Sequence, residues 1–353
     1  MNIFNQPKPI EFGVKDKALY FPYINVPTNE WFTQILLYWD EVGAIVPRDY
    51  IHEPDMLDKH MLDLVRSGLV KQIIPDLYNM DGGRNFAKSF ISLIEKYNIN
   101  RKARNSRFGP IYSSRIHIDK FGYDIAEYLV HEKLAKKEKY PWFRVESITA
   151  GLFMSYLASF LGNSDELNMQ PITDDITTFA TFSEEYATGE NNRNNHLDRM
   201  RIDILEEILP VPRYDHDVRS IVQFKESHGN LLPNFRKKIE RKIQELSFIE
   251  NPQESSYLLN QFKESVKEEI KELVAKMKEK NWGGIVFGTI CGLGAAAIPG
   301  AKAIVDRDWY TGLEAIPGLM GAVYAAYDGF RDKQKNIIES PFAYAAFVNR
   351  EFY

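Results

Sequence analysis

The stretch Trp282–Ala301 is the sequence feature that most constrains the fold. It holds twenty residues without a charge, in a chain of which 26% of the residues are charged. Gly284, Gly288 and Gly292 recur at every fourth position, so on a helix they form one smooth strip against which another backbone can pack closely. The sequence therefore predicts a Gly/Ala-rich helical hairpin over residues 283–327, with these three glycines as its interaction face.

This hairpin has two interpretations. In the first, it packs inside the protein among aromatic side chains. In the second, it enters a bilayer, which the length of the uncharged run permits and the basic flanks Lys276–Lys280 and Arg331–Lys335 favour. Pro299, Lys302 and Glu314 argue against insertion because they interrupt the apolar character of the hairpin. We favour the packed hairpin and keep conditional membrane contact as the alternative.

Composition indicates a well-packed globular protein. The chain has 353 residues, 44% of them hydrophobic and 13% aromatic, which is enough for two or three domains and a substantial core. The single cysteine, Cys291, excludes an intrachain disulfide, and the segment Met1–Pro9 lacks the basic and apolar stretches of a signal peptide. We therefore expect a cytoplasmic protein, with membrane association on activation as the alternative. The net charge of −5 argues against a protein committed as a whole to nucleic acid.

The order of elements predicts an α+β protein that is predominantly α-helical. Over residues 1–162, four strand-like segments alternate with segments of helical periodicity, which predicts an N-terminal α/β domain with a small mixed sheet covered by helices. The four segments are 18–26, 44–47, 69–74 and 111–121. Pro22 lies within the first of them and predicts that this strand runs at the edge of the sheet.

The rest of the chain predicts a linker and a helical domain. Residues 163–196 are polar and acidic, which predicts an acidic loop or linker. Residues 197–353 carry apolar stripes whose spacing averages nearer 3.6 than 3.5, which favours a packed helical bundle over a long coiled coil. This C-terminal domain includes the hairpin.

Charge is distributed unevenly along the chain. Residues 99–144 contain 11 Lys or Arg and 5 Asp or Glu, whereas residues 145–192 contain 8 acidic residues and no Lys or Arg. These blocks can pair, either within the fold or between copies of the chain, so self-association is one expectation. The alternative is two solvated faces that never meet, because exposed ion pairs contribute little stability.

Four cations in the basic block are candidate contacts for phosphate or nucleic acid. Arg101, Lys102, Arg104 and Arg107 offer positive charge, and the aromatic residues that follow them offer rings on which bases can stack. The alternative is a basic surface loop that leads into a strand. We favour the loop, which leaves nucleic acid as a partner that the sequence permits without favouring it.

Catalytic motifs are weak in this sequence. Gly82–Ser89 resembles a phosphate-binding P-loop but has Ala87 where the second glycine belongs, so we expect a turn and an ordinary helix. Asp217, in the Asp215–Asp217 cluster, is explained as a helix cap. A metal-dependent hydrolase stays an alternative, through a set of acidic residues and one histidine that could surround a divalent ion. The set is Asp174, Asp175, Glu184, Glu185 and His196.

Several motifs resemble an uncharacterised bacterial family known only as a domain of unknown function. They are Leu19–Ile24, Leu36–Val42 with Ile45–Pro47, Leu209–Pro212 with Ile221 and Phe224–Lys225, and Ser340–Tyr344. The resemblance implies one shared architecture and a bacterial or phage-associated origin, but no reaction and no catalytic residues. Association with that setting suggests a role in phage defence or mobile-element conflict.

Taken together, these features predict a protein without a catalytic centre, cofactor or metal. We expect it to act by binding another macromolecule, with a protein partner or self-association favoured. A conditionally membrane-active effector that uses the hairpin is the first alternative. A metal-dependent hydrolase or a nucleic-acid-binding protein is the second.

Overall fold

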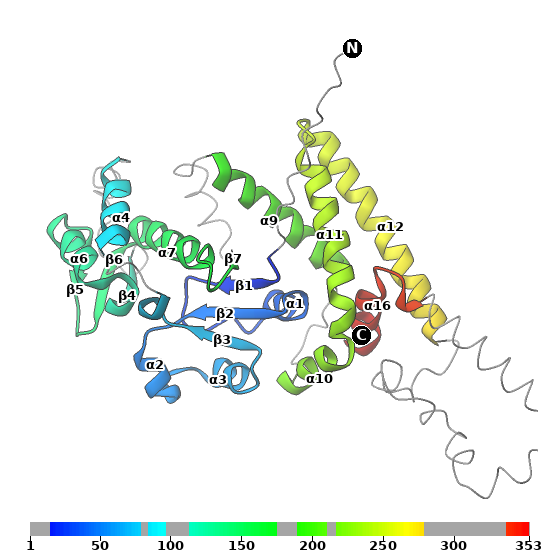
Figure 1. The fold of residues 1–353 in the computed structure, drawn as a ribbon, viewed down its shortest axis with the longest axis horizontal. Helices are drawn as coiled ribbons and strands as arrows, with labels where there is room; N and C mark the ends of the chain where they lie inside the picture. The colour runs from blue at the N-terminus through cyan, green and yellow to red at the C-terminus, as the bar shows by residue number, and fades with distance from the viewer. Residues whose placement is uncertain are drawn as a thin grey trace, which may run out of the picture. The chain divides into compact units, whose positions relative to one another are not determined.

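The computed structural model describes residues 15–78, 84–96, 113–174, 189–209, 217–278 and 337–352. These residues form an α+β protein in which helices predominate, which confirms the predicted fold class (Figure 1). They divide into two compact units, which we call the sheet unit and the helical unit. The sheet unit comprises the described parts of Met1–Val26, Trp39–Val65 and Val70–Tyr186, and the helical unit those of Pro27–Tyr38, Arg66–Leu69 and Ala187–Tyr353.

This division differs from boundaries placed at residues 162 and 197. The sheet unit extends to residue 186, and an early helix, Glu30–Tyr38, groups with the C-terminal helices. The segment 163–196, expected to be an acidic loop or linker, contains a strand at Met169–Ile172 and the start of a helix at Gly189. The strand was missed because it has only four residues, one of them a proline.

A four-stranded parallel sheet forms the centre of the sheet unit. Its strands are β1 (Lys17–Tyr20), β2 (Glu41–Ile45), β3 (Val70–Ile73) and β7 (Met169–Ile172), in the order β3-β2-β1-β7. All three pairs of neighbours are parallel. The prediction that Pro22 places the first strand at a sheet edge is wrong, because β1 ends at Tyr20 and the proline removes no ladder hydrogen bond from this central strand.

One face of this sheet packs against α7 (Ser147–Gly162), which contacts β1 and β7. Leu19, Ile45 and Ile73 from the strands belong to the same hydrophobic core as residues of α7. Gly43 in β2 leaves no room for a side chain, since an added Cβ would lie 2.8 Å from Cγ1 of Ile73.

The predicted small sheet is accompanied by a second, antiparallel sheet. It has the order β4-β6-β5, with β4 at Ser113–His117, β5 at Ala135–Lys137 and β6 at Trp142–Glu146. Residues 111–121 were expected to form one strand, but α6 (Ile118–His131) begins directly after β4. His117 explains this early start, because its side chain caps α6 by accepting a hydrogen bond from the Asp119 backbone.

Shorter helices complete the sheet unit. They are α2 (Asp49–His52), η1 (Pro54–Met56), α3 (Lys59–Arg66), η2 (Pro75–Tyr78) and α4 (Arg84–Lys96). Helix α6 is interrupted at Gly122, whose φ of 72° lies in the left-handed region that glycine adopts readily. The break separates the first turn of α6, which carries Asp119 and Lys120, from its longer second part.

The helical unit packs helices around an apolar core. Its elements are α1 (Glu30–Tyr38), α9 (Gly189–Ile208), α10 (Val218–His228), η5 (Gly229–Leu231), α11 (Leu232–Ser247), α12 (Pro252–Lys278) and α16 (Ala343–Phe352). Figure 1 shows α11 and α12 side by side, and α9 contacts both of them. Asp217 caps α10 as predicted, since its side chain accepts a hydrogen bond from the Arg219 backbone at 3.3 Å.

The C-terminal carbonyls of α1 are satisfied by three other helices of this unit. Lys225 Nζ of α10 donates to the Leu36 carbonyl at 2.9 Å, and the Tyr344 hydroxyl of α16 donates to the Leu37 carbonyl at 2.6 Å. An Arg236 guanidinium nitrogen of α11 donates to the Tyr38 carbonyl at 2.8 Å. The last carbonyls of a helix have no partner within it, so these contacts hold α1 in place.

A buried charged cluster lies beside this helix end. Glu240 Oε1 accepts from the Tyr38 hydroxyl at 2.7 Å, and Arg201 binds both carboxylate oxygens of Glu240, at 2.5 and 2.8 Å. Burial alone would raise the pKa of Glu240, but Arg201 and the hydrogen bonds offset it and leave that pKa below its ordinary value. Burial and the charge of Glu240 raise the pKa of Tyr38. The carboxylate is therefore held in its charged form by Arg201.

The predicted hairpin 283–327 lies outside the described residues, as do Gly284, Gly288 and Gly292. Within the part of the chain that the structure describes, no helix has both the length and the apolar character needed to cross a membrane. The choice between a packed and a membrane-entering hairpin therefore stays a prediction.

Candidate functional site at the carboxyl edge of the parallel sheet

The carboxyl ends of the parallel strands meet at one edge of the sheet, and polar side chains gather there. Arg48 and Asp49 follow β2, Asp76 follows β3, and Asp174 follows β7. The Tyr20 hydroxyl at the end of β1 donates to Asp174 Oδ1 at 3.1 Å, which joins two neighbouring strand ends. In open α/β sheets, ligands bind outside the carboxyl ends of the strands. This carboxyl edge is therefore the candidate site.

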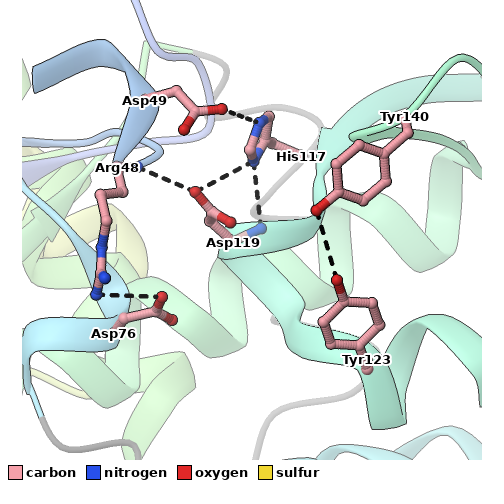
Figure 2. Close-up of polar contacts among 7 residues, drawn as sticks. All are labelled: Arg48, Asp49, Asp76, His117, Asp119, Tyr123 and Tyr140. Atoms are coloured by element: carbon pink, nitrogen blue, oxygen red, sulfur yellow. Dashed lines mark hydrogen bonds and ion pairs between the residues drawn. The ribbon is translucent and has the colours of Figure 1, made fainter. Parts of the chain in front are cut away.

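His117 lies between two carboxylates at this edge (Figure 2). Its Nε2 is 3.6 Å from Asp49 Oδ2, and its Nδ1 is 3.6 Å from Asp119 Oδ2. Nδ1 accepts the backbone N–H of Asp119 at 3.2 Å, so the ring proton is assigned to Nε2, facing Asp49. The side chain is only 2% exposed, and burial lowers the pKa of His117 despite the two carboxylates. The imidazole is therefore neutral at pH 7.

Asp119 connects the antiparallel sheet to the strand ends of the parallel one. Its Oδ2 accepts the backbone N–H of Arg48 at 3.1 Å, and the Arg48 guanidinium lies 3.6 Å from Asp76 Oδ2. Burial and the nearby charge of Asp119 raise the pKa of Asp76, which Arg48 partly offsets. A single arginine thus links two acidic residues that follow different elements, and Figure 2 shows all three on neighbouring segments.

Two exposed tyrosines lie beside these charges (Figure 2). Tyr123 and Tyr140 are 65% and 70% exposed, and their hydroxyls lie 3.4 Å apart. Three further side chains lie on segments that follow β1 and β2, which are tied together by a hydrogen bond from the Asp58 backbone to Asn25 Oδ1 at 3.2 Å. These three are Tyr23, Ile51 and Met56. Together the five are all of the large exposed apolar side chains in the described part of the sheet unit.

Lys120 is buried beneath this surface. It is 4% exposed, and its Nζ donates to the Pro22 carbonyl, beyond the end of β1, at 3.3 Å. Burial lowers the pKa of Lys120 from 10.5 to about 7. No carboxylate contributes to that shift, so the amine has no counter-charge among the described residues. At pH 7 about half of these amines are neutral.

Two arginines of the antiparallel sheet, Arg115 and Arg144, already form ion pairs with one carboxylate. Glu138 accepts from Arg115 Nε at 2.8 Å and from Arg144 Nε at 2.5 Å. The bond from Arg144 is the largest of the effects that lower the pKa of Glu138. The Arg115 guanidinium also lies over the Trp142 ring, 4.8 Å from its centroid.

At this edge the charged side chains form a network that does not include Lys120. The titratable groups are engaged with one another, His117 with Asp49 and Asp119, and Asp76 with Arg48. Among the described residues, no three His, Cys, Asp or Glu side chains are placed to hold a metal ion together. The exposed part of the edge includes Tyr123, Tyr140 and the Asp49 carboxylate.

The structure brings together few of the residues that the sequence singled out. Arg101, Lys102, Arg104 and Arg107 lie outside the described residues, so their role stays a prediction. Asp174 lies at the carboxyl edge and binds Tyr20, whereas Asp175, Glu184 and Glu185 lie outside the described residues and the side chain of His196 is not described. The described part of Gly82–Ser89 is the first turn of α4, an ordinary helix as expected.

Sequence reasoning missed the residues that form the site. A signal for three of them was present, because strands β2 and β3 are each followed by an apolar residue, a proline and then charge. Pro47 precedes Arg48 and Asp49, and Pro75 precedes Asp76. His117 and Lys120 had no comparable signal, since they come from β4 and α6 and reach the edge only through the tertiary fold.

The chain matches no protein-family model, no curated protein and no solved structure. The resemblance to an uncharacterised bacterial family, and the link to phage defence that it suggests, therefore stay expectations. Two of the motifs on which this resemblance rests are Leu19–Ile24 and Ile45–Pro47. They extend beyond the ends of β1 and β2 at the carboxyl edge.

Proposed function

We propose that this protein is a non-enzymatic binding module that binds a protein partner through the carboxyl edge of its parallel sheet. The observation that carries the proposal is the pair of exposed tyrosines, Tyr123 and Tyr140, beside the carboxylates of that edge. Single exposed apolar residues need no explanation, but neighbouring exposed aromatic rings beside charged groups are typical of an interaction surface.

The composition of the edge favours a protein over a nucleic acid. Tyrosine, methionine and arginine are the residues enriched at the centres of protein interfaces. Asp49 and Asp119 face the same region and would repel phosphates, while Arg115 and Arg144 beside it are already paired with Glu138. A partner surface with lysine or arginine side chains complements this edge.

We expect the substitution of both exposed tyrosines to weaken partner binding by at least an order of magnitude without unfolding the protein. Tyr123→Ser with Tyr140→Ser removes two exposed rings, and a loss of about 2 kcal/mol at an interface hot spot corresponds to roughly 30-fold weaker binding. Proteins retained by the immobilised chain are identified from extracts of its native cells, and the affinity of the retained partner is then measured for wild type and variant.

A matched control comes from the helical unit. Phe248 and Tyr257 are 70% and 67% exposed, so Phe248→Ser with Tyr257→Ser removes a similar exposed aromatic area elsewhere. The control should retain wild-type affinity. Equal losses from both pairs of substitutions, or no loss from the pair at the carboxyl edge, would rule out this surface as the binding site.

A further inference from the structure

Lys120 is a buried amine with no counter-charge among the residues that the structure describes. It is 4% exposed, and its one hydrogen bond in the described chain goes to the neutral Pro22 carbonyl. A buried, unpaired ammonium is costly, and proteins retain such groups chiefly where they are used. The amine has three donor positions when protonated, of which this contact uses one.

The charged groups around Lys120 are engaged elsewhere. Among elements that contact α6, η2 carries Asp76, which pairs with Arg48, and the β5–β6 turn carries Glu138, which pairs with Arg115 and Arg144. The adjacent Asp119 binds the Arg48 backbone and lies near His117, whose pKa the charge of Lys120 lowers. On α4, every charged side chain whose burial the structure describes is exposed to solvent. These residues are Lys88, Glu95 and Lys96.

The position of Lys120 in the topology is that of a ligand site. The chain runs from β1 to β2 and β3 on one side and later returns to β7 on the other side of β1. The strand order therefore reverses between β1 and β7, and ligands of open α/β sheets bind at such a switch point. Phe21 N donates to the Ile172 carbonyl at 3.1 Å, so β1 and β7 stay paired one residue beyond β1. The next residue, Pro22, supplies the carbonyl to which Lys120 donates, which places the amine at the ends of these two strands.

We propose that Lys120 binds the oxyanion of a small molecule at the switch point between β1 and β7, and that the amine takes up a proton when it does so. A phosphate, sulfate or carboxylate group supplies the missing counter-charge and accepts the unused donors. The burial of Lys120 selects a small ligand, because the phosphates of a polymer cannot follow it below the surface. This site uses a buried amine and not the exposed tyrosines of the protein-binding surface proposed above, so it does not depend on that proposal.

Proton uptake distinguishes this site from ordinary anion binding. An amine with a pKa of about 7 is about nine-tenths neutral at pH 8, so binding that restores its charge takes up nearly one proton. At pH 6 the same amine is already charged, and uptake falls to about a tenth of a proton. We expect this pattern for sulfate, titrated by calorimetry in two buffers of different ionisation enthalpy against a chloride background. Acetate serves as a carboxylate probe in a parallel titration.

Three variants make the test decisive. Lys120→Met should lose binding and proton uptake, Lys120→Arg should bind without proton uptake because its charge is permanent, and Lys136→Met, at an exposed lysine of β5, should behave as wild type. Absence of Lys120-dependent uptake with both anions would overturn the proposal. An oligonucleotide that gives such uptake where sulfate does not would overturn the assignment to a small ligand.

Discussion

Replacing Arg201 with methionine is expected to lower the free energy of unfolding by about 3–5 kcal/mol at neutral pH, because removal of one partner leaves the other charge buried. Glu240 is 5% exposed and loses the bidentate contact that offsets its burial. The Tyr38 hydroxyl would still donate to it, and the charge of Arg236, a smaller effect than that of Arg201, would remain. Urea denaturation of the purified variant measures the loss.

The pH dependence identifies the cause of that loss. In wild type the pKa of Glu240 is held below its unfolded value of 4.5, so the stability that it contributes is present above that pH and is lost as pH falls through the folded pKa. In Arg201→Met the carboxylate can protonate, so the deficit should shrink as the pH is lowered towards 5. Adding Glu240→Gln, which keeps an acceptor for Tyr38, should recover at least half of the loss.

A surface substitution on α11 provides the control. Arg241 is exposed, and Arg241→Met should change stability by no more than about 0.5 kcal/mol. A deficit in Arg201→Met that does not vary with pH, or that the second substitution deepens, would show that Arg201 acts through packing and not through charge.

Replacing Lys120 with methionine is expected to raise the free energy of unfolding by up to about 5 kcal/mol at pH 6. Burial lowers the pKa of this lysine from 10.5 to about 7, and each pH unit of that difference corresponds to about 1.4 kcal/mol. Below pH 7 both the folded and the unfolded chain carry the proton, so the full cost of burying the charge is present. Methionine is similar in length, has no charge and suits the apolar surroundings of Ile118 and Phe121.

The sign of the pH dependence follows from the lowered pKa. Between pH 7 and 10.5 the unfolded chain binds the proton and the folded chain does not, so the stability of wild type rises with pH across this window. The advantage of Lys120→Met should therefore decline from pH 7 and nearly vanish by pH 10. Lys136→Met gives the matched control, with little change at any pH. An advantage for Lys120→Met that is constant across this range would contradict the burial of an unpaired amine.

Helical periodicity allowed the helix-dominated fold class and the helical C-terminal region to be predicted from sequence. The stripe of α12 and the caps of α10 and α12 follow from local rules, because a helix satisfies its own backbone hydrogen bonds. The short strands were harder. Strand β1 stops at Tyr20 although the strand-like composition continues to Val26, and nothing local marks Met169–Ile172 as its partner.

The candidate site could be predicted only in part for the same reason. Arg48 and Asp76 follow strand ends that are readable from the sequence, but their salt bridge depends on the register of two parallel strands. Lys120 reads as an ordinary member of a basic segment, and its burial depends on the break at Gly122 and on packing against distant elements. Burial, and not residue type, makes this lysine unusual.

Site-specific photocross-linking in living cells tests most directly whether the carboxyl edge is a binding surface. A photoreactive phenylalanine analogue is placed at Tyr140 and, in a separate chain, at the equally exposed Tyr257 of the helical unit. We expect one discrete protein adduct from position 140, weakened when Asp49 is changed to lysine, and none from position 257. Failure to form a discrete adduct at position 140, or the same adduct from both positions, would contradict the proposed function.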